Sequence, residues 1–134
     1  MADPARDADA VSAPVGPYRP IVAAGPWLVC SGQLGLAPRD SESPGPPELV
    51  AGGAIPQLAR ALANAAELLG GEGATPADVV KTTVFVTDMD DYGALNDVYT
   101  DFFGDHRPAR SVVGVASLPL GAAVEVELWA YRDR

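Results

Sequence analysis

The feature that most constrains the fold is an apolar face that recurs at helical spacing through residues 55–69. Pro56 falls in the first turn of this segment, where proline is tolerated, and Gly70-Gly71 follows it as a stop signal. A helix with one apolar face is stable when that face is buried against another element. The segment is therefore predicted to be an amphipathic helix that needs a partner layer. Its apolar face consists of Ile55, Leu58, Ala59, Leu62, Ala66 and Leu69.

The partner layer is predicted to be a sheet, because runs rich in apolar and β-branched residues lie on both sides of this helix. The first two runs are separated only by the turn pair Gly25-Pro26, which indicates a hairpin. The run at 79–87 (VVKTTVFVT) is typical of a strand. The predicted strands are 21–24, 27–30, 79–87, 111–116 and 123–131.

A second amphipathic helix is expected between the third and fourth strands, ending near Gly104. Its apolar positions are Tyr92, Leu95, Tyr99, Phe102 and Phe103. A short capped turn is expected at 75–78, and an exposed loop at 37–48, where prolines prevent regular structure. The resulting order, β-β-α-β-α-β-β, favours an α+β sandwich of two layers, with both helices on one face of a mixed sheet.

The length of 134 residues fits one domain, expected at 14–134 after a frayed tail at 1–13. The net charge of −9 repels phosphate backbones, so nucleic acid is not an expected partner. A single cysteine excludes an intrachain disulfide and fits a reducing compartment. The chain has no apolar run of membrane-spanning length, and its acidic start does not resemble a secretory signal. A cytoplasmic location away from membranes is therefore expected.

The last strand predicts an unusual second sheet face. Val124, Val126, Leu128 and Ala130 alternate with a set that is half aromatic, namely Glu125, Glu127, Trp129 and Tyr131. The run at 79–87 has the same mixed character, with Val80, Thr82, Val84 and Val86 expected on the helix side. Because a solvated face is usually more polar, the second face is expected to be covered by another subunit.

Common catalytic signatures are absent from the sequence. No glycine-rich phosphate loop follows a strand, no nucleophile elbow occurs, and a lone histidine cannot form a multi-histidine metal site. His106 lies in a polar loop, where a solvated residue is favoured over a general base. Cys30 lies inside an apolar run, which favours a buried, inert thiol. Neither a metal nor a cofactor is expected.

Three places could carry chemistry. Arg110 stands where a loop enters a strand, and its guanidinium could grip a carboxylate through two parallel hydrogen bonds, although a surface ion pair is the commoner role. Glu125 and Glu127 point to one face about 6–7 Å apart, although paired exposed glutamates on a strand are more often ordinary surface residues. Tyr18 and Ser31 flank the first hairpin, where turn and capping roles explain them as well.

Successive sequence blocks resemble those of the reactive-intermediate deaminase family (Rid, formerly YjgF). The blocks are, in chain order, 13–18 (APVGPY), 31–33 (SGQ), 78–92 (DVVKTTVFVTDMDDY), 96–99 (NDVY), 108–111 (PARS) and 118–127 (LPLGAAVEVE). The resemblance implies a chorismate-mutase-like α+β fold that forms a homotrimer, with sites in clefts between subunits. It also implies cofactor-free hydrolysis of enamines and imines, such as 2-aminoacrylate, to 2-oxo acids and ammonium.

The same resemblance assigns roles to individual residues. It implies that Arg110 binds the substrate carboxylate and that Glu125 positions the attacking water. Tyr18, counted with these two as catalytic, would line the same cleft as the substrate-binding residues Ser31 and Asn96.

The chain also departs from the family pattern. Val112 stands where many of these deaminases have cysteine, and Arg19-Pro20 replaces small or amide-bearing residues. The loop at 37–48 is longer and richer in proline than usual. These departures leave the physiological substrate open.

Three other functions stay open at this point. The chain could be a specialised relative that acts on a carbonyl or imine intermediate of a biosynthetic pathway. It could be a noncatalytic binder of small carboxylates in the same cleft. RNA cleavage or translation inhibition, described for some relatives, is disfavoured by the net charge of −9.

Overall fold

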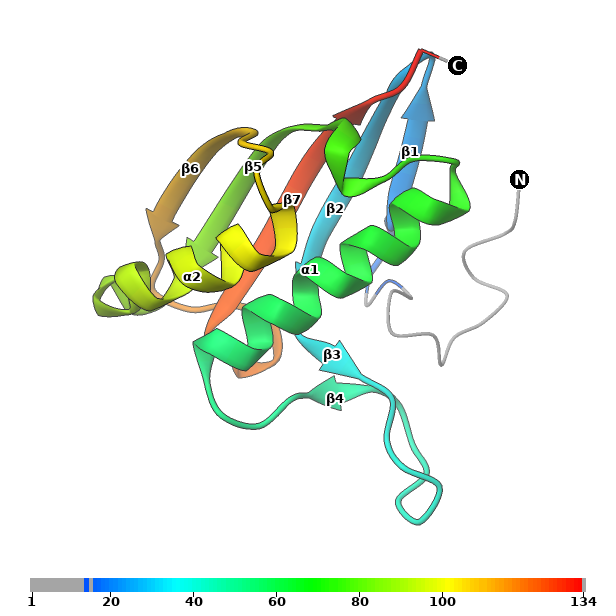
Figure 1. The fold of residues 1–134 in the computed structure, drawn as a ribbon. Helices are drawn as coiled ribbons and strands as arrows, with labels where there is room; N and C mark the ends of the chain where they lie inside the picture. Colours follow the sequence, from blue (N-terminus) through cyan, green and yellow to red (C-terminus); the bar gives the residue numbers. More distant parts are fainter. Residues whose placement is uncertain (1–13, 15, 134) are drawn as a thin grey trace.

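Two helices cover one face of a five-stranded sheet in the computed structural model (Figure 1), which describes residues 14 and 16–133. The strands of the sheet are β1 (Ile21–Ala24), β2 (Trp27–Leu34), β5 (Val79–Val86), β6 (Ala109–Gly114) and β7 (Val124–Tyr131). The helices are α1 (Ala54–Gly71) and α2 (Tyr92–Phe103). The predicted α+β two-layer arrangement is confirmed. The tail predicted at 1–13 lies outside the described residues.

The sheet is mixed, as predicted, with strand order β1-β2-β7-β5-β6. β5 and β6 are parallel, and α2 supplies the crossover that a parallel pair requires. The other neighbouring strands are antiparallel. β6 therefore forms one edge of the sheet, and β7 lies at its centre.

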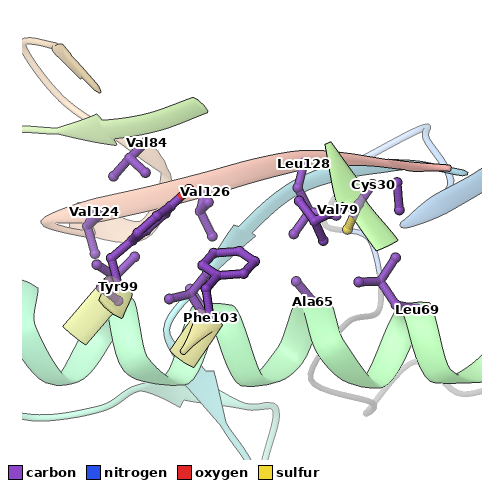
Figure 2. Packing of buried hydrophobic residues seen from close by; sticks show 14 of the residues in the cluster. Cys30, Ala65, Leu69, Val79, Val84, Tyr99, Phe103, Val124, Val126 and Leu128 are labelled. Atoms are coloured by element: carbon purple, nitrogen blue, oxygen red, sulfur yellow. The ribbon is translucent and has the colours of Figure 1, made fainter. Parts of the chain in front are cut away.

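The main core lies between the helices and the sheet (Figure 2). The inward set predicted for the last strand is confirmed, because Val124, Val126, Leu128 and Ala130 are all fully buried. Tyr99 and Phe103 point from α2 toward the sheet in Figure 2 and are also buried. The opposite face is uncovered in the single chain and exposes Trp27, Trp129 and Tyr131.

The buried face of α1 differs from the predicted one, because it includes polar side chains. Ala59 is exposed, whereas Gln57 and Asn64 are buried. The Asn64 amide donates to the carbonyls of Leu34, at 3.2 Å, and Leu36, at 2.9 Å. Gln57 Oε1 accepts the backbone N–H of Ala123 at 2.9 Å. The apolar pattern alone misses this part of the buried face, because Gln57 and Asn64 are buried through hydrogen bonds that tie the helix to the ends of strands.

The prediction for the start of β5 was wrong by one residue. An irregularity between Val79 and Lys81 in the pairing with β7 shifts the alternation, so Val79 is buried and Val80 is exposed. From Thr82 onward the predicted alternation holds, with Thr82, Val84 and Val86 buried. This β-bulge adds one residue to β5 relative to β7, so the residues before it point to the opposite faces from those that the alternation predicts.

The segment predicted as the loop 37–48 is closed at its base by a short ribbon. β3 (Leu36–Ala37) pairs antiparallel with β4 (Glu48–Leu49), and the segment between them reaches away from the helices in Figure 1. Arg39 organises it, since its guanidinium lies 3.4 Å from the Glu48 carboxylate and its Nε donates to Pro46 O at 3.1 Å.

Short 3-10 turns link the remaining elements at Pro76–Asp78, Met89–Asp91 and Pro119–Gly121. The first is the predicted capped turn, in which Thr75 and Asp78 form a reciprocal capping box. β6 begins two residues earlier than predicted, so Arg110 belongs to the strand and not to a loop. Across the described part of the chain, no helix has the length and apolarity needed to span a bilayer.

Candidate active site

Arg110 is held against α2 at the edge of the sheet. In the parallel register it lies opposite Thr82, whose side chain is buried under the helices. The Arg110 side chain therefore leaves the strand on the same, helix-covered face of the sheet. Its guanidinium carbon lies 4.8 Å from the ring centroid of Tyr99 and 5.4 Å from that of Tyr92. Nη2 also donates to the Tyr92 hydroxyl at 3.1 Å. The cation is thus supported by two aromatic rings.

Among the described residues, the guanidinium of Arg110 has no acidic partner. The ion pairs found among residues 14 and 16–133 are Arg39–Glu48 and Arg132–Glu72, although the chain carries eighteen acidic residues. The alternative interpretation of Arg110 as part of a surface ion pair is therefore wrong for the described chain. A half-buried guanidinium with unused donors is suited to bind an external anion, and a carboxylate matches its planar fork.

Asn96 belongs to the same region as Arg110. It follows Tyr92 by four residues and precedes Tyr99 by three on α2. Residues at these spacings share one helix face, so Asn96 lies between the two tyrosines that contact Arg110. The structure therefore brings two of the predicted site residues, Arg110 and Asn96, to one edge of the molecule.

Glu125 lies on the opposite face of the sheet. Its neighbours along β7, Val124 and Val126, are buried under the helices, so the Glu125 side chain emerges on the uncovered face. Partial burial raises the pKa of the Glu125 carboxyl above its usual value, and the nearby Glu127 carboxylate raises it further. This is the direction expected for a carboxylate that serves as a general base near neutral pH.

A β-bulge makes room for the Glu125 carboxylate. The pairing of β2 with β7 shifts between Cys30 and Gln33, so Ser31 and Gly32 lie in the irregular stretch next to Glu125. A Cβ placed on Gly32 would lie 2.2 Å from Glu125 Oε1 and 2.7 Å from its Cδ. A side chain at position 32 would therefore displace the carboxylate, which explains the need for glycine.

Ser31 connects the bulge to the segment that carries Tyr18. Its hydroxyl donates to Arg19 O at 2.7 Å, and its backbone N–H donates to Pro20 O at 2.8 Å. These bonds hold residues 16–20 beside β2, with the Tyr18 side chain exposed. Ser31 therefore lies in the bulge next to Gly32, which adjoins Glu125, and the segment that carries Tyr18 runs along the β1 side of β2.

The predicted site residues thus form two groups within one chain. Glu125 pairs with Phe85 on β5, and Phe85 pairs with Val113 on β6, three residues beyond Arg110. The backbones of Arg110 and Glu125 are thus two strands apart across the sheet, at about 4.8 Å per strand, and three residues apart along the strand, at about 3.3 Å per residue. Their side chains also leave opposite faces of the sheet. A single chain does not bring Arg110 and Glu125 together.

The two other titratable candidates have structural roles. Cys30 is buried, and burial raises the pKa of its thiol to about 12, so it is inert as predicted. His106 is not the solvated loop residue that was predicted. It is half-buried, and its Nε2 donates to Val79 O at 2.7 Å, which ties the loop to the start of β5. Val112 packs against the core with its side chain.

Sequence reasoning missed the tyrosines that contact Arg110. In the sequence, Tyr92 and Tyr99 count only among the apolar positions that recur at helical spacing in the second helix. Only the parallel pairing of β5 with β6, joined by α2, places these rings beside Arg110. Their hydroxyl groups were the available signal, since a phenol at a helix edge usually has a polar partner.

Comparisons with known proteins agree with this architecture. Residues 9–132 match the family model described as Endoribonuclease L-PSP. The chain is 39% identical over 115 residues to the 2-iminobutanoate/2-iminopropanoate deaminase of Mus musculus, covering 86% of this chain and 81% of the relative.

Solved structures are equally similar. The crystal structure of RidA from an Antarctic Psychrobacter has a TM-score of 0.80 at 36% identity, covering 92% of this chain and 94% of that one. The structure of Escherichia coli TdcF with bound serine has a TM-score of 0.79 at 34% identity, covering 89% and 91%. The chain therefore belongs to the endoribonuclease L-PSP family, which is the reactive-intermediate deaminase (Rid, YjgF) family.

Proposed function

We propose that the protein is a deaminase that hydrolyses small enamines and imines bearing a carboxylate, such as 2-aminoacrylate, to 2-oxo acids and ammonium. The observation that carries this proposal is the Arg110 guanidinium, held on two tyrosine rings without an acidic partner among the described residues. Relatives named 2-iminobutanoate/2-iminopropanoate deaminase support the reaction class. The TdcF relative with bound serine supports a small ligand that bears a carboxylate.

The complete site is proposed to form between copies of the chain in a homotrimer. Arg110 and Asn96 would come from one copy, and Glu125, Tyr18 and Ser31 from its neighbour. In this arrangement both groups of site residues can act on one substrate, although they lie apart within a single chain. It also gives the exposed Trp27, Trp129 and Tyr131 a partner surface, since such residues are enriched at interfaces.

The chemistry then needs no cofactor. The enamine tautomerises to the imine, and Arg110 holds the carboxylate so that the C=N carbon faces a bound water. Glu125 takes a proton from this water while the oxygen bonds to the carbon of the protonated imine, which gives a neutral carbinolamine. Glu125 returns that proton to the nitrogen, and the C–N bond then breaks as Glu125 takes the remaining hydroxyl proton, so the oxygen forms the new carbonyl. The departing ammonia takes up this last proton and leaves as ammonium, which restores the Glu125 carboxylate. Orientation and general base catalysis supply the rate acceleration.

The test is hydrolysis of imines generated in situ. An amino-acid oxidase or a serine dehydratase releases the imine, and formation of the 2-oxo acid is followed with and without the protein. We expect release well above the spontaneous rate. A rate equal to the spontaneous one, with 2-oxo acids still bound, would favour the noncatalytic carboxylate-binding function instead.

The other functions receive less support. RNA cleavage would need a phosphate-binding surface on a chain with a net charge of −9, and its lone histidine is bound to a backbone carbonyl. A role in one biosynthetic pathway uses the same chemistry and differs only in substrate. Small metabolites of this kind, and not nucleic acids or membranes, are the proposed partners, in a cytoplasmic setting.

A further inference from the structure

Tyr99 presents a buried, immobilised ring beside Arg110. Its ring is buried, and its hydroxyl shares a hydrogen bond of 2.9 Å with the buried Thr82 Oγ1. Phe103 packs against the same ring, with centroids 4.7 Å apart (Figure 2). Burial raises the pKa of the Tyr99 hydroxyl, so the guanidinium meets a neutral ring over the physiological range.

Tyr92 is a second ring beside Arg110, and it is exposed. Its side chain is 41% exposed, and its hydroxyl accepts from Nη2 at 3.1 Å while its ring lies 5.4 Å from the guanidinium carbon. An exposed tyrosine at the start of a helix contributes little to the core. Its contacts with Arg110 are therefore the specific interactions that this side chain makes.

We propose that Tyr92 and Tyr99 are positioning residues that fix the direction in which Arg110 presents its N–H donors to a carboxylate. The inference rests on the proposed function for the identity of the ligand. A free arginine side chain would lose rotamer entropy on binding, whereas one held against two rings has already lost most of it. The tyrosine pair thus raises affinity for carboxylates without touching the ligand.

The Tyr92 hydroxyl also restricts the angle of approach. A guanidinium offers two-point contact through its Nη1/Nη2 edge or through its Nε/Nη2 edge, and Nη2 belongs to both. With one Nη2 hydrogen engaged by Tyr92, only one edge keeps a full pair of donors for a carboxylate. The ligand is therefore held in one orientation relative to α2.

Binding of 2-oxobutanoate and of its methyl ester tests the inference, measured by titration calorimetry on the intact protein. In Tyr92→Leu, which removes the ring, we expect affinity for the acid to fall about tenfold, the range of a partly exposed cation–π contact plus a hydrogen bond. Tyr92→Phe, which keeps the ring, should restore affinity to within about threefold of wild type. Affinity for the ester should barely change. Tyr99→Phe, which frees the ring from Thr82, should weaken acid binding about threefold.

Phe102→Leu is the matched control. Phe102 is an aromatic residue of the same helix that packs against Phe103, with ring centroids 4.8 Å apart, whereas the rings that contact Arg110 in the described part of the chain are those of Tyr92 and Tyr99. We expect unchanged acid binding in this variant. Nuclear magnetic resonance adds a direct readout, because the Arg110 Nε–H signal, shifted by the two rings, should move in Tyr92→Leu and stay in place in Phe102→Leu.

The outcomes separate this inference from the proposed function. If the wild-type protein binds 2-oxobutanoate but does not hydrolyse imines, the proposed function is wrong. The positioning role is then still tested by the affinities of the Tyr92 and Tyr99 variants for 2-oxobutanoate. Imine hydrolysis with wild-type constants in Tyr92→Leu would overturn the positioning role and leave the function intact. Equal losses for acid and ester, or an equal loss in Phe102→Leu, would also overturn the positioning role.

Discussion

At the scale of single residues, the shape of the Arg110 side chain matters as much as its charge. A lysine keeps the charge but has no planar fork to grip a carboxylate and no flat face to lie on the rings of Tyr92 and Tyr99. We therefore expect Arg110→Lys to lose nearly as much kcat/KM as Arg110→Ala, about 30- to 1,000-fold. Steady-state imine hydrolysis measures the loss, and wild-type turnover in the lysine variant would show that Arg110 has another role.

The pH dependence of activity should identify the base. A base works only when deprotonated, so a pKa raised above the ordinary glutamate value of 4.5 moves the acid limb of kcat/KM to higher pH. Glu125→Gln should remove this limb together with about 10²–10⁴ of the turnover. Glu127→Gln removes a negative neighbour that raises the pKa of Glu125, so the limb should move to lower pH with turnover largely kept.

Circular dichroism controls for folding in both glutamate variants. An inactive Glu127→Gln beside an active Glu125→Gln would contradict the assignment and exchange their roles. If both variants keep full activity, the reaction does not use these carboxylates.

How far the candidate site could be predicted depends on the residue. Arg110, Glu125 and Asn96 stand in sequence blocks specific enough to single them out. Alternation along β7 also placed Glu125 and Glu127 on one face correctly. The contacts of Arg110 could not be predicted, since they depend on which helix crosses over β6.

At the scale of elements, the sequence predicted both helices and the main strands because each has a strong period. The second helix, Tyr92–Phe103, spans the predicted apolar positions and ends next to Gly104 as expected. The errors occur where a polar contact or an irregular pairing overrides the period. Ala59 is exposed because the buried face of α1 includes Asn64, and Val80 is exposed because β5 begins with a bulge.

The polar tether of α1 can be tested through stability. Asn64→Ala leaves the carbonyls of Leu34 and Leu36 without their side-chain donor in a buried place. We expect the free energy of unfolding to fall by about 2–4 kcal/mol, the cost of a lost buried polar contact together with a small cavity. Urea unfolding measures the change. The control Glu67→Ala, at an exposed position of the same helix, should change stability by less than about 0.5 kcal/mol. Equal effects would show that the tether contributes nothing specific.

At the scale of the whole molecule, the location of the two groups on opposite faces has a direct consequence for assembly. A reaction that uses both Arg110 and Glu125 cannot proceed within one chain folded in this way. The proposed mechanism therefore requires a second copy of the chain, which the proposed homotrimer would supply. Sedimentation equilibrium that shows a monomer at micromolar concentration would contradict the shared site.

Mixing two inactive variants tests the shared site directly. In a ring of three copies, each site takes Arg110 from one chain and Glu125 from the next. Equal amounts of Arg110→Ala and Glu125→Gln chains are unfolded, mixed and refolded into trimers. Some sites then take their arginine from a Glu125→Gln chain and their glutamate from an Arg110→Ala chain, and these sites are intact. Random assembly makes about one site in four intact, so we expect roughly a quarter of wild-type activity. Each variant refolded alone should stay inactive, as should folded trimers mixed without exchange. No recovery after refolding, with trimers present, would mean that both residues act from the same chain.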